Sequence, residues 1–470
     1  MLRLLHTSDW HLGHTLHGLS REDEHARFLA WLEERVVADE VDALVITGDT
    51  FDTTTPPASA ERALFDLLAR LRARAPRLQV VIIGGNHDSP ARLEAPAELL
   101  RALDVRVVAS LGRRPGQPLD PDRLVLPLRD RAGQVAAWLA AVPFLRPADL
   151  PPRTSAGSRD LGAAGKGTPG EPEAGEHPDA SATDGLRPRG RPGSPAAAPR
   201  SQGDELEALS AVYREVLALA RARRAPGQAL LATGHLCVRG ADPSGESERT
   251  ILGGLAPLDT DLFPPELAYV ALGHLHKAQP VGGREHVRYA GSPIPLSLTE
   301  ADYRHQVVRV DLEGERVVQL DTPTIPRTLD VLRLPPGGPD TPEEVLALLQ
   351  ALPARDAGSR PLLEVRIRLD APDPGLRRKV EEALEGKAAR LVRLTVATND
   401  APEPPALADA AGPRRLLDLA PRDVLLAAWR REHEADPPPD VLAAFDELLA
   451  GPLPAPSATP VATPEGVEAA

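Results

Sequence analysis

The chain has 470 residues, a single cysteine and a formal net charge of -14. One hydrophobic core does not grow to this length, so we expect two or three domains. The lone Cys237 excludes an intramolecular disulfide, the N-terminal apolar run is too short for a signal peptide, and no stretch is apolar enough to span a bilayer. These features predict a soluble, cytoplasmic protein. The negative charge excludes a protein that coats nucleic acid unaided, so a nucleic-acid substrate would need a local positive site or a partner.

Residues 1–149 and 204–322 alternate short apolar runs with amphipathic stretches, which is typical of an α/β domain. The first amphipathic stretch, residues 25–36, carries apolar side chains at helical spacing and predicts a helix. The predicted strands are short and apolar and are closed by glycine or other turn signals. They are Ala43–Thr47 and the runs that end at Gly84, Val142, Gly234 and Gly273.

Residues 151–203 differ sharply in composition from their surroundings. They are rich in Gly, Pro, Ala, Ser and charge, and Leu161 and Leu186 are their only large apolar residues. Such a tract cannot bury enough surface to offset the entropy of ordering it, so we expect it to be disordered. A predicted helix with apolar residues from Leu206 to Leu217 follows and returns the chain to the core. We therefore expect one domain, residues 1–322, with a disordered insertion at 151–203.

A second, smaller domain is predicted at residues 326–400. Its pattern is βαβ-like: a strand near 329–334, a helix near 342–352, the strand LLEVRIRL, a helix near 375–384 and the strand LVRLTVAT. Two short amphipathic helices are predicted beyond it within residues 414–450. The Pro/Ala-rich tail, residues 451–470, is expected to be disordered.

Polar residues follow the predicted strands directly. Several stand in D-x-H and H-x-H patterns, in which residues i and i+2 of an extended segment point the same way. Mixed carboxylate, imidazole and amide ligands suit divalent first-row ions. Two such ions about 3.5–4 Å apart can activate a water and stabilise both oxygens of an in-line displacement, which is the chemistry of phosphoester hydrolysis. The residues are Asp9, His11, Asp49, Asp52, Asn86, His87, Asp88, His235, His274 and His276.

In this order the motifs DxH, GDxxD, GNHD, GH and GHLH resemble those of the calcineurin-like metallophosphoesterase superfamily. HTSDWHLG, GDTFD, GGNHDSP, SERTILGG and YAGSPIPLSLTE resemble the SbcD family within it, over His6 to Glu300 with residues 151–203 unmatched. The resemblance implies an α/β (α+β) fold. We expect a metallophosphoesterase β-sandwich flanked by helices, a small α/β capping domain that faces DNA, and a C-terminal helical partner-binding segment.

Carried over by position, the resemblance implies two divalent metal ions, with Mn²⁺ as the expected metal. One ion would be held by Asp9, His11, Asp49 and His276, and the other by Asp49, Asn86, His235 and His274, with Asp49 bridging. His87 would donate a proton to the leaving oxygen or stabilise charge on the phosphate, and Asp52 would orient His87.

The neighbouring residues have simpler interpretations. A carboxylate after a GNH turn bonds its own loop more often than a metal, so Asp88 is left out of the ligand set. Cys237 is expected to be a small buried residue, because a thiolate would favour zinc. Trp10 is expected to pack beneath its loop. His6, His14 and His17 stay open between contacts near the site and ordinary core or surface positions.

Three functions fit this sequence. The resemblance implies a DNA nuclease, with ATP-dependent exonuclease activity on duplexes and endonuclease activity on single strands and hairpins. It also implies an SbcC-like ATPase partner with a coiled coil, and a homodimer within a heterotetramer; no membrane is involved. Trp429 and Phe445 would anchor the segment 414–450 on that partner. The alternatives are a metallophosphoesterase for small phosphodiesters or nucleotides, which has no need of the capping domain, and a non-catalytic scaffold, which has no need of a complete ligand set.

Overall fold

The structure, a computed structural model, describes residues 1–113, 117–150, 202–242, 257–355 and 360–398, with isolated positions between 422 and 445. The predicted insertion up to residue 201 and the predicted tail lie outside these residues, as does most of the predicted partner-binding segment. Met1–Ala397 form one compact unit and Thr398–Ala470 another. Within the described ranges, no helix has both the length and the apolar character needed to cross a membrane.

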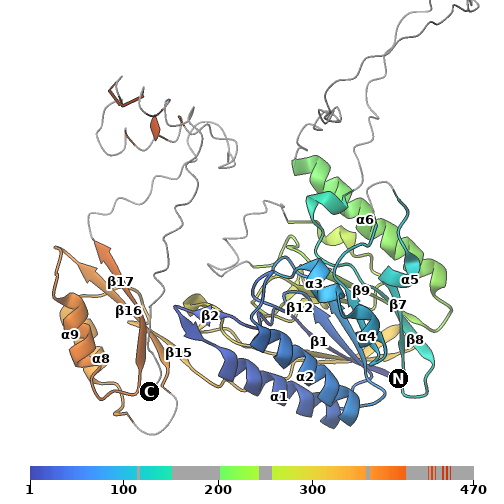
Figure 1. The fold of residues 1–470 in the computed structure, drawn as a ribbon, viewed down its shortest axis with the longest axis horizontal. Coiled ribbons are helices and arrows are strands. Elements are labelled where there is room, and N and C mark those ends of the chain that lie inside the picture. Colours follow the sequence, from blue (N-terminus) through green and yellow to red (C-terminus); the bar gives the residue numbers. More distant parts are fainter. Residues whose placement is uncertain are drawn as a thin grey trace, which may run out of the picture. The chain divides into compact units, whose positions relative to one another are not determined.

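Two six-stranded mixed sheets form the larger part of the first unit (Figure 1). In the first sheet β1, β4, β5 and β6 run parallel, and β13 and β14 extend it antiparallel beyond β1. Its strands, in spatial order, are β14 (Arg316–Asp321), β13 (Val308–Glu313), β1 (Leu2–Thr7), β4 (Ala43–Thr47), β5 (Gln79–Ile83) and β6 (Val105–Val108).

The second sheet is likewise mixed. Its four central strands are parallel, and an antiparallel strand closes each edge. Its strands, in spatial order, are β11 (Gln279–Val281), β12 (Arg284–Tyr289), β10 (Tyr269–Gly273), β9 (Ala229–His235), β8 (Val135–Ala140) and β7 (Val125–Arg129). The strand expected to end at Val142 stops at Ala140, and the other predicted strand ends lie within one residue of those observed.

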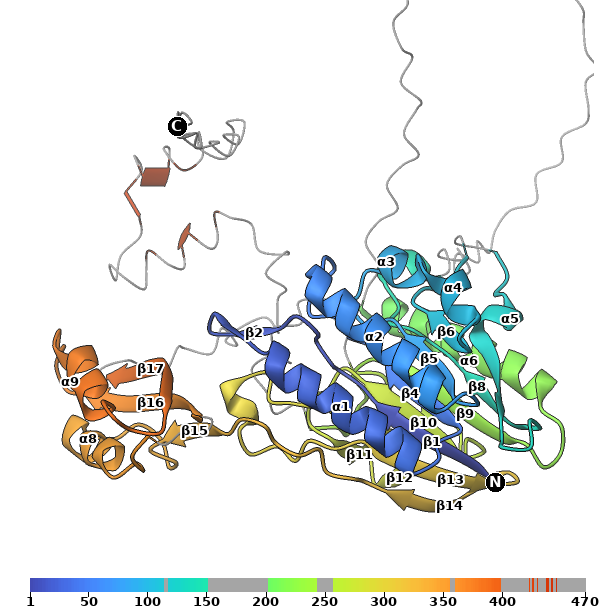
Figure 2. The same ribbon diagram turned by 60° about the horizontal axis from the view of Figure 1, so that its bottom comes forward.

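The sheets pack against each other through apolar side chains that point inward from both, such as Leu4 and Val45 from the first and Val270 from the second. A second core fills the space between the first sheet and two helices, α1 (Glu22–Ala38) and α2 (Ala58–Arg74). These helices lie side by side over that sheet (Figure 2). The predicted β-sandwich flanked by helices is confirmed.

Local sequence explains where the long helices lie. In α1 three acidic residues occupy the first turn and Arg35 the last, so the charges complement the helix dipole. Phe28, Leu32 and Val36 form its buried face, as the sequence predicts. A further helix, α6 (Gln202–Arg223), packs on β8 and β9 and begins two residues inside the insertion predicted at 151–203. The shorter elements are β2 (Thr15–Leu16), β3 (Leu19–Ser20), α3 (Pro90–Glu94), α4 (Ala97–Arg101), α5 (Pro121–Leu124), η1 (Pro147–Asp149), η2 (Thr260–Leu262) and η3 (Leu298–Glu300).

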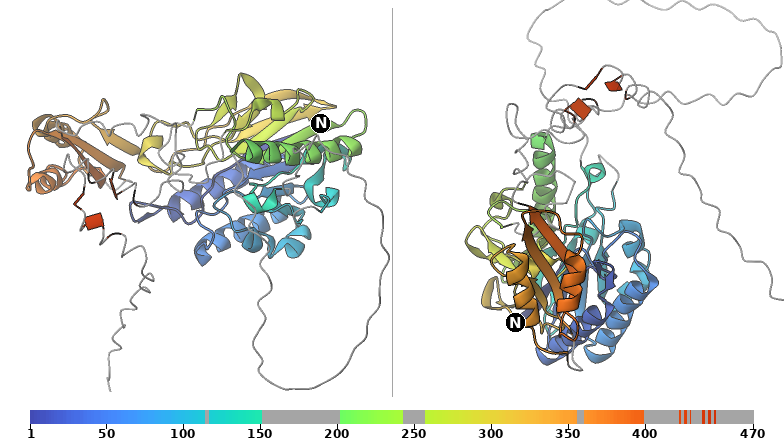
Figure 3. Two further views of the ribbon diagram at one scale, coloured as in Figure 1. Left: turned by 90° about the horizontal axis from the view of Figure 1, so that it is seen from above. Right: turned by 90° about the vertical axis from the view of Figure 1, so that its left-hand side faces the viewer.

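The predicted βαβ-like unit is a three-stranded sheet with two helices over one face, as Figure 3 shows in its right-hand view. Thr341 caps the first of these helices by accepting a hydrogen bond from the Glu344 N–H, and Pro342 occupies its first position. The unit has its own core, which is separate from those of the two large sheets. Its elements are β15 (Val331–Leu334), α8 (Pro342–Gln350), β16 (Leu362–Leu369), α9 (Leu376–Ala383) and β17 (Arg390–Thr398).

Candidate metal centre

The carboxyl ends of parallel strands from both sheets deliver the predicted ligands. Asp9 follows β1 and Asp49 follows β4 in the first sheet, whereas His235 ends β9 and His274 follows β10 in the second. The two first-sheet loops are joined by main-chain hydrogen bonds, from Asp9 N–H to the Gly48 carbonyl at 3.1 Å and from His11 N–H to the Asp49 carbonyl at 2.9 Å. The ligand site therefore lies where strand ends of open α/β sheets usually place one.

Four of the predicted ligands have left-handed backbone conformations. The φ angles are 53° at Asp9, 47° at His11, 48° at Asp49 and 103° at His274. A residue with a Cβ pays about 1–3 kcal/mol for such a conformation, and it persists only where surrounding bonds impose it. The main-chain hydrogen bonds between the loops do so at Asp9, His11 and Asp49, and the hydrogen bond from the His274 N–H to the Asp9 carboxylate does so at His274.

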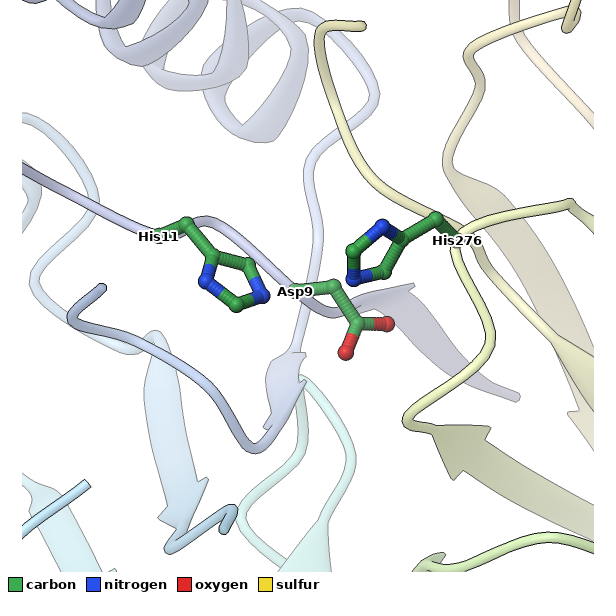
Figure 4. A group of neighbouring side chains, drawn as sticks. All are labelled: Asp9, His11 and His276. Carbon is green, nitrogen blue, oxygen red and sulfur yellow. The ribbon is translucent and has the colours of Figure 1, made fainter. Parts of the chain in front are cut away.

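Asp9, His11 and His276 form a first group, in which one ligand atom from each lies within 4.8 Å of the others. Figure 4 shows the three side chains directed toward one another from two different loops. One Asp9 oxygen accepts a hydrogen bond from the His274 N–H at 2.9 Å. The other Asp9 oxygen and Nε2 of His11 are buried without any hydrogen-bond partner. Buried polar atoms are seldom left so, and a cation between them would satisfy both.

A second group comprises Asp49, Asn86, His235 and His274. Nε2 of His235 lies 2.9 Å from Asn86 Oδ1 and 3.2 Å from Asp49 Oδ2, and Nδ1 of His274 lies 3.1 Å from Asn86 Oδ1. Asp49 Oδ2 is also 3.6 Å from His11 Nε2, so this carboxylate stands between the two groups. Nδ1 of His235 donates to the Thr47 carbonyl at 2.9 Å, which leaves Nε2 directed at the centre.

The charges in the second group are tightly linked. Burial raises the pKa of Asp49, but the neighbouring His235 outweighs burial and holds it well below its ordinary value. Burial lowers the pKa of His235, yet Asp49 raises it to about 9, whereas burial and His235 lower the pKa of His274 to about 3. The raised pKa of His235 favours its protonated form beside the Asp49 carboxylate, and a bound cation would replace that proton. Carboxylate, imidazole and amide donors fit divalent first-row ions.

The contact between His87 and Asp52 differs from the one expected from the sequence. Nδ1 of His87 donates to the main-chain carbonyl of Asp52 at 2.7 Å, not to its carboxylate. The Asp52 carboxylate instead accepts from Nδ1 of His11 at 3.2 Å and Nδ1 of His14 at 2.9 Å. Asp52 therefore orients His87 through its backbone and His11 through its side chain. The His87 ring is half-buried, with its centroid 4.7 Å from that of the His11 ring, and because Nδ1 bonds the Asp52 carbonyl, Nε2 is the nitrogen left for other contacts.

Three neighbours have structural roles. The buried Asp88 carboxylate accepts hydrogen bonds from the Gly85 N–H of its own loop, as the sequence suggested, and also from the Thr50 and Phe51 N–H groups, so it ties its loop to the one that follows β4. Trp10 is fully buried and packs on Phe28 beneath the loop. Both ring nitrogens of the buried His6 are bonded, to Tyr269 and to Thr47. Cys237 is half-buried rather than buried, and His17 is exposed.

Sequence reasoning missed two contacts at this site. Glu300 accepts a hydrogen bond from His276 Nδ1 at 3.0 Å, and His14 bridges the Asp52 carboxylate and the Leu296 carbonyl, at 2.9 Å on each side. Burial raises the pKa of Glu300, but His276 lowers it to about 2, so the group is a carboxylate. The only available signal was the position of Glu300 at the end of YAGSPIPLSLTE, and the sequence does not show which histidine that segment reaches.

Known proteins match the chain along most of its length. Residues 2–129 match the calcineurin-like phosphoesterase family, and residues 326–433 match the family described as Type 5 capsule protein repressor C-terminal domain (SbcD_C). The chain is 40% identical to the SbcD subunit of the SbcCD nuclease from Rhodobacter capsulatus, over 91% of this chain and 94% of the relative. It is 35% identical to the SbcD subunit from Escherichia coli over 68% of each chain, and 31% identical to the one from Bacillus subtilis over 66% of each. The chain therefore belongs to the SbcD family of metal-dependent nucleases.

Proposed function

We propose that this nuclease hydrolyses DNA phosphodiester bonds with two Mn²⁺ ions held where the two sheets meet. One ion is assigned to Asp9, His11, Asp49 and His276, and the other to Asp49, Asn86, His235 and His274. The observation that carries the proposal is the place of Asp49, whose Oδ2 lies 3.6 Å from a nitrogen of one group and 3.2 Å from a nitrogen of the other. A carboxylate in this place can bridge two closely spaced ions.

The ligand set also suits the charge of the substrate. Asp9 and Asp49 contribute about two negative charges against about four positive charges on two divalent ions, and the other ligands are neutral. The loaded site therefore stays positive and attracts a phosphodiester, although the chain as a whole carries -14. When bound, the ions would activate a water and stabilise the attacking and leaving oxygens.

The remaining chemistry belongs to His87. Its main-chain N–H donates to Asp49 Oδ1 at 2.9 Å, and its ring is fixed by the Asp52 carbonyl, so it is tied to the bridging carboxylate without binding through its side chain. Nε2 of His87 is placed to donate a proton to the leaving oxygen or a hydrogen bond to the phosphate. Asp52 supports both His87 and His11.

For the rest of the chain we propose the organisation expected from the sequence. Residues 1–322 are the nuclease domain and residues 326–400 face DNA. Residues 414–450 bind the coiled coil of an ATPase partner in an assembly with two copies of each subunit. The separate core of the unit formed by β15, α8, β16, α9 and β17 supports the second boundary, and the family match that reaches residue 433 supports the third segment. Truncation after residue 410 should abolish co-purification with the ATPase and spare Mn²⁺-dependent cleavage of single strands. Undiminished co-purification would refute this assignment.

The substrate is tested by cleavage of labelled duplex and hairpin DNA in Mn²⁺, with and without the ATPase and ATP, beside a chromogenic small phosphodiester. We expect DNA to be cut far more efficiently than the small ester, and the partner with ATP to increase cleavage of duplex ends. Asn86→Ala is the loss-of-function control. A preference for the small ester would favour the alternative of a small-phosphodiester enzyme.

A further inference from the structure

Glu300 ends the short helical turn η3 and is completely buried. Its Oε1 accepts a hydrogen bond from Nδ1 of His276 at 3.0 Å. Glu300 lies outside the two ligand groups, because it contacts Nδ1 of His276, whereas the other end of the ring is directed toward Asp9 and His11. Burying a carboxylate costs desolvation free energy, which its hydrogen bonds must offset.

Both oxygens of the Glu300 carboxylate face hydrogen-bond donors. Oε2 accepts from the Leu296 N–H at 2.8 Å and from the Ser292 hydroxyl at 3.5 Å. Oε1 accepts from the Ser297 hydroxyl at 3.3 Å in addition to His276. Both oxygens must therefore act as acceptors, which a carboxylate does and an amide cannot.

This arrangement fixes the tautomer of His276. Because Nδ1 donates to Glu300, the proton of the neutral ring is on Nδ1, and the lone pair is on Nε2. Figure 4 shows the His276 ring directed toward Asp9 and His11. His11 is held in the same way, since its Nδ1 donates to Asp52. His235 differs, because its Nδ1 donates to the neutral carbonyl of Thr47.

We propose that Glu300 is a positioning residue that holds His276 with Nε2 toward the ion shared with Asp9 and His11, and that it strengthens this ion position selectively. The inference rests on the proposed ligand assignment. A carboxylate that accepts from the second nitrogen of a ligating imidazole fixes the ring and makes it a stronger donor. At one ion position, His11 and His276 both donate to carboxylates, whereas at the other position His235 donates to a carbonyl. The two positions should therefore differ in their affinity for metal.

Glu300→Gln is the direct test. If the glutamine oxygen accepts from His276, the glutamine N–H₂ group faces the Leu296 N–H, and two donors meet. If the oxygen accepts from Leu296, the N–H₂ group faces Nδ1 of His276, and the ring proton has to move to Nε2. In a calorimetric titration of the metal-free full-length protein with Mn²⁺, we expect one binding step to weaken about 10- to 100-fold and the other to stay unchanged. Ser297→Ala is the matched control: it removes one hydrogen bond to Glu300, leaves the carboxylate on His276, and should alter neither step.

A second measurement reads the tautomer in the wild-type protein, so it does not depend on how Glu300→Gln folds. In ¹⁵N-histidine spectra of the Zn²⁺-loaded chain, with His276 assigned by comparison with His276→Gln, the ring proton should be on Nδ1. A proton on Nε2, or a Glu300→Gln protein that binds both ions like the wild type, would overturn the inference. Failure of the ligand assignment itself looks different: His276→Ala would then retain both binding steps.

Discussion

Gly273, the last residue of β10, offers a test of how the two sheets hold the centre. A Cβ built on Gly273 would lie 1.9 Å from the Thr47 carbonyl oxygen and 3.0 Å from Nδ1 of His235. Real Cβ contacts do not fall below 3.0 Å, so in Gly273→Ala the ends of β4 and β10 must separate by about 1 Å. This separation would disturb the hydrogen bond between Thr47 and His235 and would also displace the neighbouring His274.

The expected magnitudes follow from this displacement. Overpacking of a tight core costs about 1–3 kcal/mol, and a backbone obstacle places this case near the upper end. For a domain of this size, this loss lowers Tm by roughly 3–5 °C. A displacement of about 1 Å in a catalytic centre costs on the order of 10²-fold in rate, so Mn²⁺ content and DNA cleavage should both fall.

The assay compares thermal unfolding, bound Mn²⁺ after dialysis and cleavage of labelled single-stranded DNA. Gly337→Ala is the matched control, because a Cβ there meets nothing within 4 Å, and all three measurements should stay unchanged. A Gly273→Ala protein with wild-type Tm, metal content and cleavage would refute the idea that the packed strand ends fix the centre.

Two other substitutions separate a metal ligand from a proton donor, and a third tests the pH dependence of stability. Asn86→Ala should lower Mn²⁺ content and cleavage together, as metal analysis beside the nuclease assay will show; full activity would remove Asn86 from the ligands. His87→Ala should retain nearly normal metal content while cleavage falls by about 10²-fold or more, and metal loss would make it a ligand instead. Burial lowers the pKa of His25 to about 3 in the folded protein, so between about pH 6.5 and pH 3 the unfolded chain binds more protons than the folded one. The stability that neutral His25 contributes is therefore present above about pH 6.5 and is lost as the pH falls toward 3. The loss amounts to at most about 1.4 kcal/mol per pH unit. Chemical unfolding at several pH values should show a shallower acid dependence in His25→Gln, and an unchanged dependence would contradict this.

The sequence predicted the elements and the strand ends well for a physical reason. Short apolar runs closed by glycine, such as those ending at Gly84 and Gly273, have few alternative structures, and parallel strands bring their carboxyl ends to one edge. The burial of Trp10 and the loop contacts of Asp88 were predictable in the same way, because they depend on neighbours close in the chain or on the adjoining strand exit.

Contacts between segments far apart in the chain could not be predicted in detail. Glu300 reaches His276 through a turn whose direction is set by tertiary packing, and no local pattern specifies it. Asp52 was expected to face His87, yet its carboxylate turns to His11 and His14, because two imidazole donors outcompete one ring that the Asp52 carbonyl already satisfies. Side-chain partners of this kind depend on distances of a few tenths of an ångström, which sequence spacing does not contain.

The position of the centre between the sheets has an energetic consequence. Each sheet bonds a ligand loop of the other, through Asp9 with the His274 N–H and through Thr47 with His235. The left-handed backbones at the proposed ligands and the unsatisfied Asp9 oxygen cost stability in the metal-free chain, about 1–3 kcal/mol for each strained residue. Ions that bind only the folded state return about 2.7 kcal/mol at a concentration one hundred times Kd. The bonds that impose these backbones therefore also preorganise the loops for the proposed ions, and metal loading would strengthen the contact between the sheets.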